Sequence, residues 1–478
     1  MKALKVFTLV FLVAVMTTSL VAAQGGGVWD SSFTVVNLGT SDATVSVTFY
    51  AEDGTAYTPP TLGTSTGAVN NPFTLAPGSS VEILLFLTTG LPDGRYSVVI
   101  SADQPIAAIA NLTNTVYSPP QSPSFSGSYS GFEDVGQTAV YMPAIVEDYY
   151  NWNSHVSMQN LTGGDLAITI EFFTEGTNTV CHTEGPTTVK AYSSWHLDVS
   201  TLDLANTSCN VNPAVDGYNG SAKVSAAGPI AVVDNQTADI YGMTATYRGF
   251  TPDQATNKYF VPALYYLYYN WFSSINIQNV GTVATTVTVD YSDSAADATC
   301  DLDPGESCLL INLLETGHDP KFSAVVTADN PAAQLVVVAQ AGTTVESGLN
   351  QAFAYEPFSA GGTTFGLPLT MDMYYGWFTS FTVQNVGTAN VNIQYTYAPD
   401  PSVGFAGATC NAGPIAPGAN LEIVQIADPC VDLPEGYHGG VVVTGTGPII
   451  VIVSQNNVEQ MTARPGDWSM SYRGVSQQ

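Results

Sequence analysis

Short segments in which apolar residues alternate with Thr, Ser or other polar residues recur along the whole chain. Two examples are residues 43–49, Ala-Thr-Val-Ser-Val-Thr-Phe, and residues 283–291, Val-Ala-Thr-Thr-Val-Thr-Val-Asp-Tyr. A period of two places one face of a strand in a core and the other face toward solvent. No segment shows the periodicity of a convincing amphipathic helix. The pattern therefore predicts an all-β protein made of short, half-buried strands.

One unit of this kind occurs four times. Each copy opens with a Trp and reaches an Asn at the same spacing: Trp29–Asn37, Trp152–Asn160, Trp271–Asn279 and Trp377–Asn385. An alternating strand follows, then in three copies a Pro-Gly pair: Pro77-Gly78, Pro304-Gly305 and Pro417-Gly418. Pro presets φ and Gly accepts a positive φ, so the pair predicts a tight turn between strands. A unit of about 110 residues suits an immunoglobulin-like sandwich.

These turns and strands support a resemblance. The Asn-Val-Gly turn, the alternating strand and the Pro-Gly turn resemble those of the CARDB-type and related Ig-like domains of bacterial secreted and surface proteins. The resemblance extends over nearly the whole chain after residue 23 as four matches, although copy two lacks the Pro-Gly turn. It implies tandem immunoglobulin-like antiparallel β-sandwiches, and the family name implies a role in cell adhesion.

The N-terminus has the features of a secretory signal peptide. Lys2 and Lys5 precede an apolar run over residues 6–15, and small residues end at Ala23. The run is shorter than the roughly 20 residues that span a membrane, so cleavage after Ala23 is favoured over an uncleaved anchor. We predict a signal peptide over 1–23, Ig-like domain 1 over 24–118, a linker over 119–138, and domains 2, 3 and 4 over 139–250, 251–357 and 358–478, the last with a C-terminal tail. No second such run occurs, so we expect a secreted, extracellular or cell-surface protein without a membrane span.

Export makes the six cysteines candidates for disulfides. Three of the four repeats hold two cysteines each, which selects one of the fifteen pairings. We predict the pairs Cys181–Cys209, Cys300–Cys308 and Cys410–Cys430. Zinc is the rival interpretation, but no pair has the two-to-four-residue spacing of zinc sites.

The two ends of the chain differ from the interior repeats. Copies two to four are preceded by a strand with a central Pro, at Pro143, Pro262 and Pro368, whereas copy one has no such strand. A sheet without an edge strand exposes backbone groups that can accept a strand from another chain. One hypothesis is that domain 1 is completed by the C-terminal tail of a neighbour, so that rods of four domains form a head-to-tail fibre. The alternative is a sandwich that simply has one strand fewer.

Charge narrows the range of partners. The chain carries 40 acidic and 10 basic side chains, a formal net charge of −30. A nucleic-acid partner needs a basic stripe, and binding to an anionic membrane surface needs a basic patch, so both are excluded. Hydrophobic residues make up 45% of the chain and aromatic residues 11%, which argues against disorder.

Aromatic clusters are the most suggestive candidates for a binding site. They recur just before the Trp of copies two to four: Tyr149, Tyr150 and Trp152; Tyr265, Tyr266, Tyr268, Tyr269 and Trp271; and Tyr374, Tyr375 and Trp377. Tyr and Trp are enriched at recognition surfaces, so these residues could stack on sugars. They could equally pack the junctions between domains, and their recurrence at every internal junction favours packing.

Other chemistry is weakly indicated. Asp301, Asp303 and Glu306 could bind calcium, which prefers oxygen ligands, but their spacing is not that of an EF-hand. The five His residues occupy no common position in the repeats, and an active site is usually built once. We therefore expect no cofactor and a non-enzymatic cell-surface protein, structural or adhesive, that self-assembles into filaments or binds a cell-surface protein, a matrix protein or a polysaccharide. The alternative function is a carbohydrate-binding array of Tyr and Trp platforms.

Overall fold

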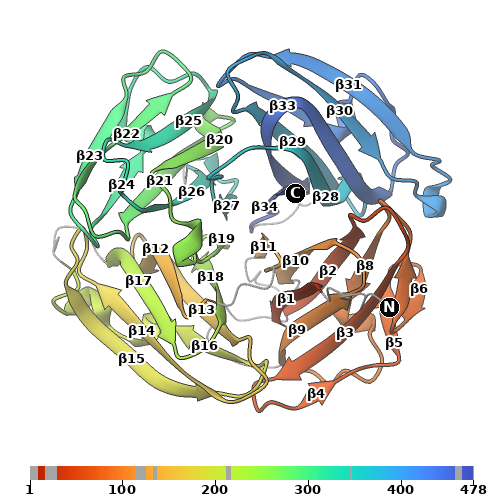
Figure 1. Ribbon diagram of the computed structural model, residues 1–478, viewed down its shortest axis with the longest axis horizontal. Helices are drawn as coiled ribbons and strands as arrows, with labels where there is room; N and C mark the ends of the chain where they lie inside the picture. The colour runs from red at the N-terminus through yellow and green to blue at the C-terminus, as the bar shows by residue number, and fades with distance from the viewer. Residues whose placement is uncertain are drawn as a thin grey trace, which may run out of the picture.

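The chain folds into four β-sandwich domains arranged around a common centre (Figure 1). The computed structural model describes residues 9–16, 29–114, 125–132, 137–210, 217–344, 347–457 and 466–476. Within these ranges every element is a β-strand or a short 3-10 helix. The prediction of an all-β chain of antiparallel sandwiches is confirmed.

Domain two shows the plan that all four domains share. We call its eight strands a to h in chain order: β12 (Ala139–Glu147), β13 (Asn153–Asn160), β14 (Leu166–Phe173), β15 (Val180–Val189), β16 (Ser194–Asp198), β17 (Tyr218–Ala226), β18 (Ile230–Ala238) and β19 (Met243–Arg248). Strands d-c-f-a form one sheet and strands e-b-g-h form the other. All of these pairings are antiparallel.

Domains three and four repeat this order. Domain three consists of β20 (Lys258–Tyr268), β21 (Trp271–Asn279), β22 (Thr285–Tyr291), β23 (Ala298–Leu302), β24 (Ser307–Ile311), β25 (Lys321–Ala328), β26 (Leu335–Thr343) and β27 (Ala352–Tyr355). Domain four consists of β28 (Gly362–Asp372), β29 (Trp377–Asn385), β30 (Val391–Tyr397), β31 (Ala408–Ile415), β32 (Asn420–Val424), β33 (Tyr437–Asn457), β34 (Ser469–Arg473) and β35 (Val475–Ser476). Here f and g are one continuous strand, β33, and β35 adds to β28.

Domain one follows the same order with a different first strand. It consists of β1 (Leu9–Met16), β2 (Trp29–Asn37), β3 (Ala43–Ala51), β4 (Ala56–Tyr57) and β7 (Phe73–Leu75) together at position d, β8 (Ser80–Leu84), β9 (Arg95–Ala102), β10 (Ile106–Asn114) and β11 (Ser126–Ser130), with an inserted hairpin of β5 (Thr61–Thr64) and β6 (Gly67–Asn70). β1 pairs with β9, in the place of strand a. The Pro-led first strand of the other copies is absent from copy one, as the sequence predicts, and this edge is instead paired with residues 9–16, which belong to the predicted signal peptide. The predicted linker over 119–138 needs correction, because β11 belongs to the sheet of domain one.

The strand order departs from that of an immunoglobulin domain. The pairs b–e and c–f are shared with the Ig fold. Strand g, however, pairs with b rather than with f, and strand a occupies the place beside f. Strand h adds an eighth strand beside g. The resemblance thus holds for the sandwich and its turns but not for the whole strand order.

Alternation along the strands builds each core. In β30 the residues Val391, Ile393, Tyr395 and Tyr397 are buried and those between them are exposed, as the sequence pattern predicts. Strand g is different, because all nine residues of β18 are buried. Both faces of this strand are covered, one by its own domain and one by the preceding domain.

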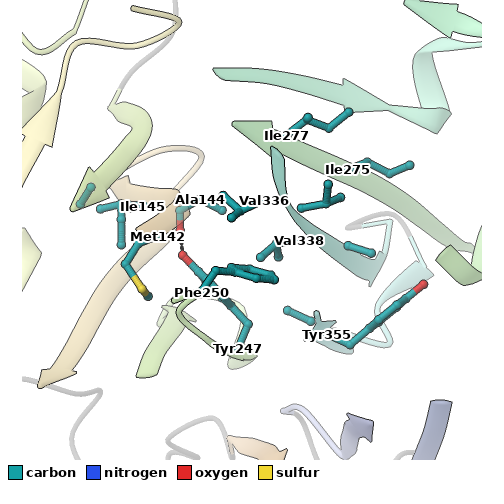
Figure 2. Packing of buried hydrophobic residues seen from close by; sticks show 14 of the residues in the cluster. Met142, Ala144, Ile145, Tyr247, Phe250, Ile275, Ile277, Val336, Val338 and Tyr355 are labelled. Carbon is teal, nitrogen blue, oxygen red and sulfur yellow. Dashed lines mark hydrogen bonds between the residues drawn. The ribbon is translucent and has the colours of Figure 1, made fainter. Parts of the chain in front are cut away.

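The domains pack in a closed ring rather than a rod. Strand a of each of domains two, three and four contacts strands b and g of the next: β12 meets β21 and β26, β20 meets β29 and β33, and β28 meets β2 and β10 of domain one. Figure 2 shows the first of these junctions, where Met142 and Ile145 of β12 lie near Val336 and Val338 of β26. These four side chains have no exposed surface. Apolar junctions of this kind fix neighbouring domains relative to one another, so the expected rod is wrong.

The four h strands meet at the centre of the ring (Figure 1). β11 contacts β19 and β34, and β27 contacts the same two strands. Asp467 joins the domains there: its buried carboxylate accepts hydrogen bonds from the backbone N–H groups of Thr244 (2.7 Å), Ala352 (3.0 Å) and Ser469 (3.0 Å). Its carbonyl accepts one from the Ser126 hydroxyl at 2.9 Å. Burial raises the pKa of Asp467 well above its ordinary value.

Disulfides lock three of the domains. The structure joins Cys181 to Cys209, Cys300 to Cys308 and Cys410 to Cys430, the pairs that the repeat predicts. Disulfides are typical of proteins that fold in an oxidising compartment. Within the described ranges there is no helix with the length and apolar character that crossing a membrane requires.

Candidate functional site: the tip hairpins

The recurrent aromatic residues lie on three equivalent hairpins that connect strands a and b. We call residues 148–152, 267–271 and 373–377 the tip hairpins. In the first, Tyr149 and Trp152 exchange backbone hydrogen bonds of 3.2 and 3.0 Å around a two-residue loop. Tyr374 and Trp377 do so at 3.0 Å in both directions, and Tyr268 pairs with Trp271 in the same way. The sequence motif therefore marks a tight turn with a fixed register.

Each loop places a tyrosine in an unfavourable backbone conformation. The loop residues have positive φ: Tyr150 (50°) and Asn151 (68°), Tyr269 (48°) and Asn270 (68°), and Tyr375 (49°) and Gly376 (81°). Two positive φ angles are the requirement of a type I′ turn, which favours Asn, Asp or Gly at both positions. The second position follows this rule. A bulky residue at the first position costs about 1–2 kcal/mol, and all three hairpins place a tyrosine there.

These second tyrosines project into solvent. The exposed fractions are 62% for Tyr150, 75% for Tyr269 and 76% for Tyr375. The preceding tyrosine supports each ring edge to face, with centroid separations of 4.8, 4.7 and 4.8 Å. We call Tyr150, Tyr269 and Tyr375 the tip tyrosines. They are exposed aromatic groups at equivalent places in three domains of the ring.

The first tyrosine of the pair lies at a domain junction in domains three and four. The Tyr374 hydroxyl donates a hydrogen bond to Glu82 of domain one at 3.3 Å. Lys321 lies 4.9 Å from the centre of the Tyr268 ring and pairs with Glu422 of domain four. Burial raises the pKa of the Tyr374, Tyr268 and Tyr149 hydroxyls.

The tryptophans pack inward, beside the central strands. Trp271 lies 5.1 Å from Phe353 and Trp377 lies 6.3 Å from Trp468, measured between ring centroids. Trp29 stacks on Phe125 in the same way, and Trp152 packs against Met243 and Ala352. Tyr265 is buried against Trp271, and Tyr266 lies beside His318. The structure thus divides the predicted set: the tryptophans and Tyr265 pack inward, Tyr268 and Tyr374 lie at domain junctions, and the tip tyrosines are the members of the set that are largely exposed to solvent.

In the acidic turn that the sequence suggests as a calcium site, the carboxylates of Asp301 and Glu306 accept hydrogen bonds from nearby groups of the same domain. Asp301 accepts from the Thr286 hydroxyl at 2.6 Å, and Glu306 accepts from the backbone N–H of Asp303 at 2.8 Å. Together with Asp329 these residues line a surface pocket. Among residues that the structure describes, no three His, Cys, Asp or Glu side chains are placed to hold a metal ion.

One buried polar cluster was not singled out by the sequence. His318 lies between two carboxylates, with Nδ1 3.0 Å from Asp293 and Nε2 2.8 Å from Glu315, and its ring stacks on Phe322. It belongs to domain three alone, and the repeat comparison finds no counterpart at that position. A single occurrence gives a sequence argument nothing to align, so only the structure could find it.

Comparisons with known proteins give limited context. No protein-family model matches the chain, and no curated protein matches it. A solved structure of Thermotoga maritima 1070 is similar over 26% of this chain and 92% of its own, at 15% identity and a TM-score of 0.19. A tetra-tandem repeat from the extending region of a large adhesion protein is similar over 98% of this chain and 99% of its own, at 14% identity and a TM-score of 0.10. Likenesses of this size carry no statement about the function of the chain.

Proposed function

We propose that the protein is a secreted, non-enzymatic component of a cell surface, structural and adhesive, which binds its partner through the tip tyrosines. The observation that carries the proposal is the repetition of one costly feature. Three loops keep a tyrosine at a turn position that favours Asn or Gly, and three times that tyrosine is exposed. Backbone strain of this kind persists where function uses it.

The closed ring gives these tyrosines a common frame. Apolar junctions hold the domains in fixed positions, so several tip tyrosines can engage one extended surface together. Linked sites bind a repetitive surface far more tightly than each site does alone. An adhesive role needs this multivalency. The three disulfides are consistent with an extracellular location.

The non-enzymatic part of the proposal rests on the same repetition. An active site is generally built once in a chain, whereas the tip hairpins recur with the same geometry in three domains. The partner is a cell-surface protein, a matrix protein or a polysaccharide. A carbohydrate-binding array is the second candidate function, because exposed aromatic rings can stack on sugar rings as well as on protein surfaces.

The test compares binding by the exported protein with binding by a triple variant, Tyr150→Gly, Tyr269→Gly and Tyr375→Gly. Glycine accepts the positive φ of these positions, so the variant should fold with unchanged or higher thermal stability. Binding to intact cells, immobilised matrix proteins and a glycan array should fall by more than about tenfold, a loss of about 1.4 kcal/mol or more.

A matched control removes exposed apolar side chains elsewhere. Phe86, Ile240 and Leu314 are 63%, 65% and 79% exposed, and the variant with all three changed to Ser should bind like the parent. Signal on the glycan array alone would select the carbohydrate-binding function. Full binding by the triple glycine variant, or binding to none of these surfaces by the parent, would overturn the role of the tip tyrosines.

A further inference from the structure

Strand a has a special feature in domains two, three and four. Its pairing with strand f is interrupted by a bulge, between Met142 and Ile145 in β12, Val261 and Leu264 in β20, and Leu367 and Thr370 in β28. A proline lies inside each bulge: Pro143, Pro262 and Pro368. Proline has no N–H to give to the ladder, and a bulge leaves a residue unpaired, so the two features belong together.

A buried tyrosine of strand h donates a hydrogen bond to this bulge in each of the three domains. The hydroxyl of Tyr247 donates to the carbonyl of Ala144, and that of Tyr355 donates to the carbonyl of Ala263, both at 2.6 Å. Tyr472 donates to the carbonyl of Leu369 in the same way. In every case the acceptor is the residue directly after the proline. The Pro-containing strand a and the buried tyrosine of strand h therefore form one repeated contact.

In domain one this contact is incomplete. Tyr129 occupies the same place in β11 and is 3% exposed, yet its hydroxyl has no hydrogen-bond partner among the described residues. Residues 9–16 pair with β9 in an unbroken register, from Leu9 opposite Ala102 to Met16 opposite Arg95. They contain no proline. This segment satisfies the backbone of β9 but supplies no carbonyl to Tyr129, and an unpaired buried hydroxyl is costly.

The edge of β9 lies at the junction between domains one and two. The hydroxyls of Ser97 in β9 and Ser194 in domain two are 2.6 Å apart, and Ala231 and Val233 of β18 pack into the core of domain one. Removal of residues 1–23, which the sequence predicts, would leave the backbone groups along this edge without their strand. An unpaired strand edge of this kind is a template for an added strand.

We propose that the β9 edge of domain one is a strand-acceptor site for an extended segment of another polypeptide. The segment pairs antiparallel with β9 and carries an apolar-Pro-Ala or apolar-Pro-Leu sequence. The backbone carbonyl of the residue after its proline accepts a hydrogen bond from the Tyr129 hydroxyl. The three other domains show the chemistry of this occupant. The C-terminal tail, which the sequence suggested as donor, does not fit, because β34 pairs with β33 and β35 pairs with β28 in its own domain.

The experiment uses the exported protein, whose N-terminus is first established by intact mass. The probe is a labelled peptide of residues 138–148, which contains strand a of domain two, and binding is followed by fluorescence anisotropy. The parent should bind this peptide, and a peptide with Pro143→Ala should bind more weakly. Tyr129→Phe removes only a hydroxyl without a partner, so it should fold and should weaken binding of the parent peptide about five- to tenfold, as loss of one buried hydrogen bond does.

Two controls keep the proposal open to refutation. Tyr247→Phe removes the equivalent hydroxyl in domain two, where strand a already pairs with the sheet edge. Peptide affinity should therefore not change. The triple glycine variant of the tip tyrosines should also keep its peptide affinity, because the strand-acceptor site does not depend on the proposed adhesive function. A mass showing that residues 1–23 are retained, absence of peptide binding, or equal affinity of Tyr129→Phe and the parent would each overturn the proposal.

Discussion

Domain one and domain three are built on the same eight positions, but they are completed in different ways. In domain three, strand a carries its proline bulge, Tyr355 is hydrogen-bonded to it, and Cys300–Cys308 links strands d and e. In domain one, residues 9–16 occupy the same edge, the Tyr129 hydroxyl has no hydrogen-bond partner within the described part of the chain, and the sequence supplies no cysteine. The difference teaches that a sheet edge can pair with a strand through its backbone alone, whereas the buried tyrosine of strand h is hydrogen-bonded where strand a carries its proline bulge.

The junctions on either side of domain one differ as well. One position of strand e faces the preceding domain in each case. It is Glu82 where domain four meets domain one, and it is His196 where domain one meets domain two. The equivalent residue in domain four is Glu422, paired with Lys321. The ring thus uses one architecture with different charges at equivalent contacts, and these differences can be tested separately.

The largest effect is expected at the centre of the ring. Asp467→Ala removes the acceptor of three buried N–H groups, two of them in domains two and three. Each orphaned donor costs about 1–3 kcal/mol, so protection of the Thr244 and Ala352 amides in hydrogen exchange should fall by about 3 kcal/mol or more. Domain one contacts the carbonyl of Asp467 instead, through Ser126, so β11 should change less. Asp467→Asn keeps one acceptor oxygen, so amide protection in this variant should lie between that of the parent and that of Asp467→Ala. Equal loss in β11 and β19 would show that the centre opens as one unit.

Much of this architecture could be predicted from the sequence. The alternating pattern gave the half-buried strands such as β30, and the Trp-to-Asn spacing gave strand b in all four domains. The repeat also gave the three disulfide pairs. These features depend on local patterns that each copy repeats, and local patterns survive in a single sequence.

The ring was not predicted, and the reason is physical. Closure depends on the outer face of strand g, which is apolar because it packs on a neighbouring domain. The signal was present in runs such as Ile230–Val233, in which consecutive residues are apolar, as in strands covered on both faces. The tip tyrosines were predicted only as part of a larger aromatic set. Nothing in the sequence separates Tyr149 from Tyr150, because their opposite environments arise from the φ angles of the turn.

Reduction of the disulfides should accelerate hydrogen exchange in domains two, three and four but not in domain one, which has no disulfide. Closing a loop of the observed lengths stabilises a domain by about 3 kcal/mol, so hydrogen exchange in β17, β25 and β33 should accelerate by roughly 100-fold after reduction. The amides of β9 should keep their rates. Cys300→Ser with Cys308→Ser is the matched control, because it should affect domain three alone. Acceleration of β9 by the same factor would contradict independent stabilisation of the domains.

Acid should act on the two junctions of domain one in opposite directions. Burial, reinforced by Arg95, lowers the pKa of His196 to about 3. The unfolded chain binds a proton near pH 6.5 and the folded chain does not, so this contribution to stability is complete above pH 6.5 and is lost as the pH falls toward 3. Burial raises the pKa of Glu82, so protonation of Glu82 favours the folded state in acid.

Between pH 7 and pH 4.5, the hydrogen-exchange protection of the β16 amides should fall by about 2.5 kcal/mol, while that of the β8 amides should hold or rise. His196→Gln can keep the contact to Ser157 without titrating, so it should remove most of the loss in β16. An undiminished loss in that variant would assign the acid sensitivity to another group, such as the buried His155, whose pKa is also lowered by burial.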